Sequence, residues 1–146
     1  MAKTLPRASN NPYKKKGSII GLEQGKIPPQ AVELEEAVLG ALMIDKNALN
    51  EVIDILESEC FYKDAHREIY SAIKTLFTES QPIDMLTVST MLRKNGKLEL
   101  CGGDYGIANL TQKVASSAHI EYHARIIVQK HIQRSLIKVS SEIIHD

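Results

Sequence analysis

Hydrophobic residues recur at helical spacing along most of the chain. From Ala31 to Asp45, apolar positions fall on one face, and glutamates occupy the first turns, where the helix dipole favours negative charge. This pattern predicts a first helix over 31–45. Asn47 is a predicted N-cap for a second helix, whose apolar positions are Leu49, Val52, Ile53 and Leu56.

Three more helices are predicted between residues 63 and 114. The segment KDAHREIYSAIKTLF, residues 63–77, places its apolar side chains on one stripe. Pro82 then interrupts the pattern, and Asp84 is a predicted cap for a short helix that ends at Asn95-Gly96. Asp104 is the predicted cap of a fifth helix, with Ile107, Leu110 and Val114 facing inward.

The last segment, from Ser117 onward, has a helical period over about 28 residues, or about 40 Å of helix at 1.5 Å per residue. It is longer than the bundle needs, and neither a glycine cap nor a proline follows before Asp146. We therefore expect the chain to be a fragment whose last helix continues in a larger protein. Its periodic positions are Ile120, Ala124, Ile127, Val128, Ile132, Leu136, Val139 and Ile143.

Strand signals are weak, because only residues 97–101 alternate and they have no evident partner. The predicted fold is therefore all-α, an orthogonal bundle of about five short helices followed by a long one. We expect three parts: a basic, disordered arm over 1–27, the bundle over 28–116 and the long helix over 117–146.

Composition fits one soluble domain, with 146 residues, 43% apolar and 25% charged. No apolar run reaches the roughly 18 residues of a membrane span, so we expect a cytoplasmic protein. Cys60 and Cys101 are too few and too far apart to predict a disulfide framework or zinc site. The net charge of zero hides an asymmetry: residues 1–30 carry six basic side chains and one acidic, whereas the rest carry 12 and 17. Such an acidic body favours protein partners over nucleic acid.

Two glycine-rich stretches resemble phosphate loops only superficially. GLEQGKI, residues 21–27, is one residue short of a P-loop and has Ile27 where the hydroxyl belongs. CGGDYG, residues 101–106, places Asp104 where phosphate would be repelled, so it is interpreted as a turn and helix cap. No cofactor-binding residue is predicted.

Histidines are the other candidates for chemistry. His119 and His123 have i, i+4 spacing, but HIEYH lacks the H-E-x-x-H order and a third ligand, so no metal site is predicted. His66 would be the base of a small hydrolase in one hypothesis, yet no nucleophile can be assigned to it. A structural hydrogen bond is the favoured interpretation, and no catalytic residue is predicted.

A winged-helix DNA reader is a second hypothesis. The segment 86–98 is predicted to contain a short helix with Arg93, Lys94 and Lys97 at its end, an arrangement similar to that of a recognition helix. These cations also complement the negative end of a helix, and the acidic body favours that explanation.

The ordered segments resemble the N-terminal domain of bacterial replicative DNA helicases of the DnaB type, over residues 27 to about 144. The family's double proline matches Pro28-Pro29, and P-I-D matches residues 82–84. E-x-E-x-x-V-L-G matches residues 33–40, and F-Y-x-x-x-H-x-x-I-(Y/F) matches residues 61–70. The sequence departs at G-G-x-x-Y-L, where Tyr105 stands one place early, and at V-P-S-A-A-N-I, which reads VASSAHI.

The resemblance implies a bundle followed by a helical hairpin that pairs between subunits in a collar above a ring of ATPase domains. It implies self-association, as a dimer in isolation and a hexamer in the parent, and contacts with primase and with a helicase loader where one exists. ATP and Mg²⁺ would bind the parent's C-terminal domain, so this chain is not expected to be an enzyme. DNA would be contacted weakly or not at all.

The long helix is the predicted interface, because surplus apolar surface marks contact sites. Its candidate residues are Ile120, Ala124, Ile127, Val128, His131, Leu136 and Val139.

Overall fold

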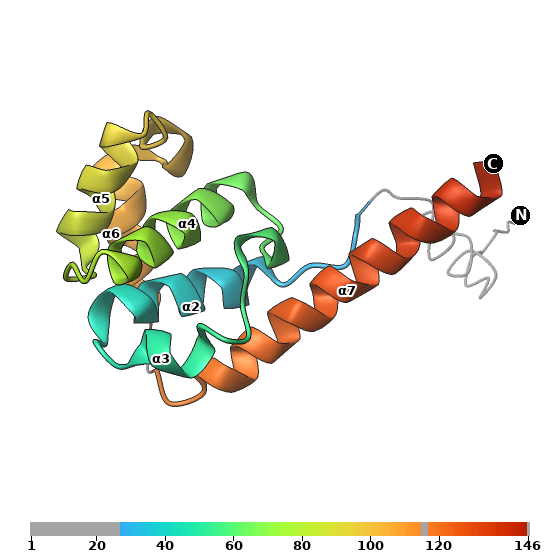
Figure 1. Ribbon diagram of the computed structural model, residues 1–146, viewed down its shortest axis with the longest axis horizontal. Helices are drawn as coiled ribbons and strands as arrows, with labels where there is room; N and C mark the ends of the chain where they lie inside the picture. Colours follow the sequence, from blue (N-terminus) through green and yellow to red (C-terminus); the bar gives the residue numbers. More distant parts are fainter. Residues whose placement is uncertain (1–26, 115–116, 146) are drawn as a thin grey trace, which may run out of the picture.

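The computed structural model describes residues 27–114 and 117–145, and over these ranges it contains helices and no strand, which confirms the all-α prediction. Five short helices form a bundle, and a long helix extends away from it (Figure 1). The basic arm to residue 26, with most of GLEQGKI, lies outside the described residues. The helices are α2 Val32–Ile44, α3 Ala48–Val52, α4 Asp64–Thr78, α5 Met85–Lys94, α6 Gly103–Gln112 and α7 Ile120–His145, with short 3-10 helices η2 Ser58–Cys60 and η3 Glu99–Cys101.

Helix α2 lies at the centre of the bundle, packed against α4, α6 and α7. Its contact with α6 is unusually close at Gly40, where an added Cβ would lie 2.2 Å from the carbonyl oxygen of Leu110 and 2.4 Å from a methyl group of Val114. Only glycine allows the two backbones to approach this far. Val38, Leu39 and Leu42, which neighbour Gly40 in the sequence of α2, are buried in the core.

The predicted helix caps were partly right. Asp84 caps α5, since its carboxylate accepts the Thr87 amide at 2.8 Å while the Thr87 hydroxyl accepts the Asp84 amide at 3.0 Å. Asn47 stands at the predicted N-cap position of α3, but its side chain makes no capping hydrogen bond. Asn47 has helical backbone angles, and its amide donates to Oδ1 of Asp45 at 2.9 Å. Helix α3 is also shorter than predicted, although Leu56 beyond it is still buried.

The predicted cap at Asp104 was wrong. Gly102 occupies the N-cap position with φ of +88°, so α6 starts at Gly103, one residue before Asp104. Asp104 instead accepts hydrogen bonds from Arg93 at 2.9 and 3.1 Å, which ties the start of α6 to the end of α5. The turn interpretation of this stretch is confirmed, because Gly96 and Gly102 both have positive φ.

Helix α7 has two parts with different surroundings. Its first half packs on α2 and α3, and its second half projects from the bundle, so that its C-terminal end is far from α3 (Figure 1). Its 26 residues correspond to about 39 Å.

Candidate protein-interaction surface

The apolar residues of α7 form two faces rather than the single stripe that the sequence suggested. Since an α-helix turns about 100° per residue, Ile120, Ala124 and Ile127 share one side of the axis. Ile132, Leu136, Val139 and Ile143 share another side, about 120° around the axis from the first. The two sets follow one another along the chain, which is why they resemble one continuous period.

The first face belongs to the core of the bundle. Ile120, Ala124 and Ile127 are 2%, 0% and 1% exposed, and half-buried Val128 packs against the same core. For the three buried residues the predicted interface role needs correction, because a side chain enclosed by its own chain offers no surface to a partner. Their predicted position on one face of the helix was right, but that face packs in the core of the bundle.

The second face is exposed to solvent. Ile132, Leu136, Val139 and Ile143, which we call the distal stripe, are 51%, 62%, 50% and 68% exposed. Leu136 and Val139 were predicted interface residues, whereas half-buried His131 lies on the side of the helix that faces the bundle. Every side chain from Ser135 to Ile143 is exposed, so this half of α7 has no cover from the described part of the chain.

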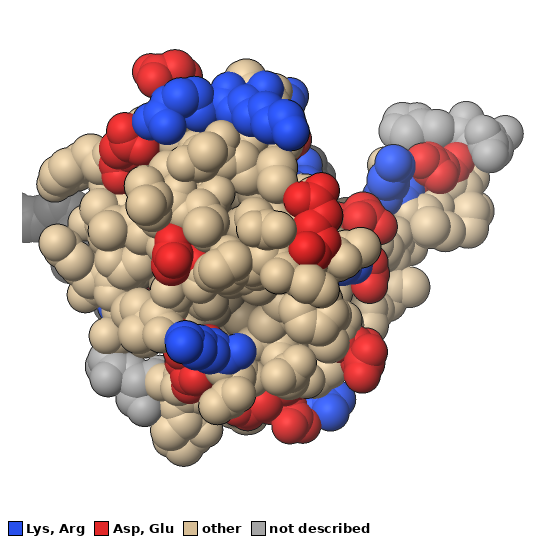
Figure 2. All heavy atoms as spheres, turned by 60° about the vertical axis from the view of Figure 1, so that its left-hand side comes forward, with Lys and Arg blue, Asp and Glu red and all other residues tan. Residues whose placement is uncertain are grey.

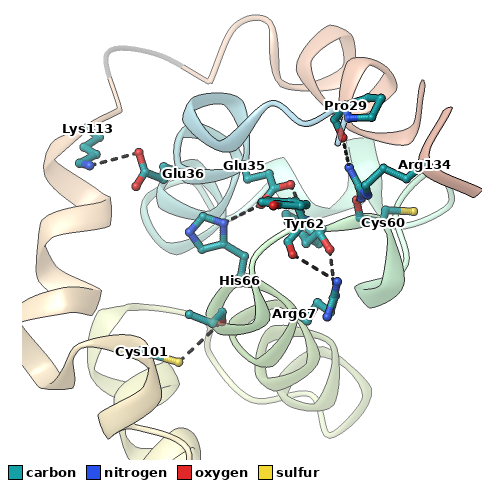
Figure 3. Close-up of polar contacts among 12 residues, drawn as sticks. Pro29, Glu35, Glu36, Cys60, Tyr62, His66, Arg67, Cys101, Lys113 and Arg134 are labelled. Atoms are coloured by element: carbon teal, nitrogen blue, oxygen red, sulfur yellow. Dashed lines mark hydrogen bonds and ion pairs between the residues drawn. The ribbon is translucent and has the colours of Figure 1, made fainter. Parts of the chain in front are cut away.

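Arg134 marks the point where α7 leaves the bundle. Its guanidinium donates to the carbonyl oxygen of Pro29 at 2.8 Å and to that of Cys60 at 2.9 Å, and it lies 5.4 Å from the centre of the Tyr62 ring (Figure 3). Burial lowers the pKa of this guanidinium, and the Glu35 carboxylate counteracts the shift. We call Pro29, Cys60, Tyr62 and Arg134 the α7 junction.

The carbonyl groups beneath the junction are bonded by side chains, whereas the backbone amides of Cys60 and Phe61 donate to the carbonyl oxygens of Glu57 and Ser58. Two arginines occupy three successive carbonyl groups, since Arg134 donates to Cys60 and Arg67 donates to Phe61 at 2.9 Å and to Tyr62 at 3.2 Å. The Tyr62 amide donates to Oε2 of Glu35 at 2.6 Å. Because buried backbone groups need partners, these contacts fix residues 60–62 in place.

Glu35 and His66 form a buried pair in the core. Nδ1 of His66 donates to Oε1 of Glu35 at 2.7 Å, and their side chains are 4% and 1% exposed (Figure 3). Both oxygens of Glu35 therefore accept hydrogen bonds, which is how a buried carboxylate is normally accommodated. This arrangement matches the structural interpretation of His66.

The hydrolase hypothesis gains nothing from the surroundings of His66. A hollow of about 430 Å³ beside it is also lined by Cys101. Burial, reinforced by the Glu68 carboxylate, raises the pKa of the Cys101 thiol to about 11. The thiol therefore stays protonated at neutral pH, and it donates to the carbonyl oxygen of Ala65 at 3.6 Å. A protonated thiol is a poor nucleophile.

The remaining candidates for ligand binding are the histidine pair of the last helix and the basic residues at the end of α5. His119 and His123 lie with ring centres 6.5 Å apart, and no group of three metal-ligating side chains occurs among the residues that the structure describes. At the end of α5, Arg93, Lys94 and Lys97 are exposed, and Arg93 pairs with Asp104. Figure 2 shows a group of basic side chains at the top of the view with acidic ones beside them, and a largely uncharged surface below that carries scattered acidic and basic side chains.

Sequence reasoning missed Glu35 and Arg134. Glu35 was interpreted only as a first-turn glutamate favoured by the helix dipole, and the structure shows that it is buried. Arg134 follows Ile127 and His131 at i, i+4, i+7 spacing, and this continuation of the bundle face by a cation was a usable signal. An inward-facing charge in an apolar period indicates a buried polar partner.

None of the described helices combines the length and hydropathy that crossing a bilayer requires.

Comparisons with known proteins agree with the resemblance seen in the sequence. The family described as DnaB-like helicase N terminal domain matches residues 27–129. Replicative DNA helicase DnaB of Rhodothermus marinus is 46% identical over 114 residues, which are 78% of this chain and 12% of that protein. The protein of the same name from Geobacillus stearothermophilus is 38% identical over 121 residues, which are 83% of this chain and 27% of that protein.

A solved structure is similar over most of the chain. The crystal structure of the N-terminal domain of DnaB helicase from Mycobacterium tuberculosis superposes with a TM-score of 0.79 at 31% sequence identity. The match covers 82% of this chain and 85% of that one. The chain thus spans the N-terminal domain and only 12% to 27% of the length of these two curated relatives.

Proposed function

Since the chain belongs to the family of DnaB-like helicase N-terminal domains, we propose that it is the assembly module of a replicative DNA helicase and joins subunits through α7. The parent protein would unwind duplex DNA with ATP and Mg²⁺. We assign no ATP, Mg²⁺ or catalytic residue to this chain.

The observation that carries the proposal is the exposed distal stripe. Ile132, Leu136, Val139 and Ile143 are separated by four, three and four residues, which is the spacing of a and d positions in a coiled coil. Each is at least half exposed, and the stripe points away from the side of α7 that packs on the bundle. Apolar surface of this regularity is typical of helix–helix contacts.

Charge supports a protein partner over DNA. Residues 31–146 carry 12 basic and 17 acidic side chains, so the body repels a phosphate backbone. We therefore extend the proposal to contacts of the bundle with primase and, where one exists, a helicase loader. The proposed assembly is a dimer for this chain and a hexamer for the parent.

The test is sedimentation velocity of the chain over a concentration series. Leu136→Glu places a charge in the middle of the stripe and is expected to give monomer at concentrations where the unchanged chain associates. Ser141→Glu is the matched control, because Ser141 is exposed on the same half of α7 but off the stripe. Only monomer for the unchanged chain, or equal loss in both variants, would contradict the proposal.

A further inference from the structure

The α7 junction is the last polar attachment of α7 to the bundle before its exposed half begins. Arg134 contacts two segments far apart in sequence, since Pro29 precedes α2 and Cys60 ends η2. From Ser135 to Ile143 the side chains of α7 are exposed. Within the part of the chain that the structure describes, the contacts that fix the direction of the projecting half therefore lie at or before Arg134.

The buried face alone constrains this direction weakly at its distal end. Ile127 is the last fully buried side chain of α7, and Arg134 lies two turns beyond it, about 10 Å along the axis. Apolar contacts are non-directional, so they allow the helix end to tilt. Hydrogen bonds to two carbonyl oxygens impose a defined distance and angle, and a planar guanidinium is suited to hold both at once.

One of the two acceptor segments, the one that contains Cys60, is itself held by several hydrogen bonds. Residues 60–62 are fixed by Arg67 on the carbonyl groups of Phe61 and Tyr62 and by Glu35 on the amide of Tyr62. The Tyr62 ring, 5.4 Å from the guanidinium, adds a platform on a second side. Arg134 is thus anchored to a rigid part of the bundle.

We propose that Arg134 is a positioning residue that sets the angle at which the distal half of α7 leaves the bundle, and through it the geometry in which two copies meet. The second part of this inference rests on the proposed assembly function. The first part stands on the junction alone, and the two can be tested separately.

The angle is measured in a chain kept monomeric by Leu136→Glu. Spin labels at Glu51→Cys on α3 and Ser141→Cys on α7 report the distance between bundle and helix tip by pulsed electron resonance. Burial raises the pKa of both Cys60 and Cys101, so their thiols compete poorly for the label.

Arg134→Met keeps much of the apolar stem and removes the donors, and it should broaden the distance distribution at least twofold. Arg134→Lys keeps the charge but cannot hold both carbonyl groups in the same way, so an intermediate width is expected. Arg125→Met is the control, because Arg125 is exposed and, among the described residues, its side chain pairs with Glu121 on its own helix and not with the bundle. Distributions for Arg134→Met and Arg125→Met that coincide would overturn the inference.

Two further measurements, the distance distribution of Arg134→Lys and the self-association of Arg134→Met, complete the test. If Arg134→Met fails to fold by circular dichroism, Arg134→Lys decides, and an unchanged width in that folded variant would overturn the inference. With Leu136 restored, Arg134→Met should weaken self-association about tenfold. Association that is lost with Leu136→Glu and unchanged with Arg134→Met would leave the assembly function standing and contradict the link to its geometry.

Discussion

The two faces of α7 predict opposite effects for two alanine substitutions on the same helix. Ile127→Ala removes a buried side chain from the core of the bundle. Leu136→Ala, nine residues later, removes a side chain that is 62% exposed. The first should lower the stability of the single chain, and the second should lower only its association.

The expected changes in the free energies of unfolding and association follow from how deeply each side chain is buried. Ile127 is 1% exposed, and shortening a core isoleucine to alanine costs about 2–5 kcal/mol through lost contacts and the cavity left behind. Leu136→Ala should change the free energy of unfolding of the monomer by about 0.5 kcal/mol or less. On association, the exposed part of Leu136 contributes about 1–2 kcal/mol per copy, so a symmetric dimer should be weakened by about two orders of magnitude.

Two assays separate the effects. Urea unfolding followed by circular dichroism, at concentrations where the chain is monomeric, gives the free energy of unfolding. Sedimentation velocity over a concentration series gives the dissociation constant.

The reverse pattern would contradict the assignment of the two faces of α7. If Leu136→Ala destabilised the monomer as much as Ile127→Ala, the distal stripe would not be a free surface. If Ile127→Ala weakened association at unchanged stability, the first face of α7 would not belong to the core.

Other predictions concern the bundle itself. Gly40→Ala should destabilise it by about 1–3 kcal/mol in urea unfolding, because the new methyl group meets the carbonyl oxygen of Leu110, and α2 and α6 must move apart. Ser80 has φ of +58°, so Ser80→Gly should raise the midpoint of thermal unfolding by removing left-handed strain worth about 1 kcal/mol. The amide of Asn47 and the hydroxyl of Ser117 lower the pKa of Asp45 below 3.8, so its contribution is present above this value and disappears as the pH falls through the lowered pKa. Unfolding of Asp45→Asn should accordingly be less sensitive to acid, and an equal pH profile for both chains would contradict this.

Sequence periodicity was sufficient for the helices but not for their surroundings. The apolar pattern predicted α4 and α5 closely, and Asp84 was found as a cap because a capping side chain acts within one turn. The pattern could not separate the two faces of α7, since Ile127 and Leu136 are both apolar and only the rest of the fold decides which is covered. Periodicity predicts which residues share a face of the helix, and only the tertiary structure shows what that face packs against.

The proposed interface and the α7 junction also show what periodicity cannot predict. Leu136 and Val139 were predicted as interface residues from their spacing, whereas Glu35 was interpreted only as a first-turn residue that the helix dipole favours. Its burial depends on His66 and Tyr62, which are 31 and 27 positions away. The role of Arg134 likewise depends on Pro29 and Cys60, and contacts so distant in sequence leave no periodic signal.

The long span of the Arg134–Pro29 bond also has a consequence for biosynthesis. The two residues are 105 positions apart. At ordinary rates of translation, Arg134 is therefore synthesised roughly 5–20 s after Pro29. During this interval α2 and α3 lack the cover of Ile120, Ala124 and Ile127, and their apolar faces are open to other chains. A nascent chain that stalls before α7 is complete is therefore the form of this protein most exposed to aggregation and most in need of a chaperone.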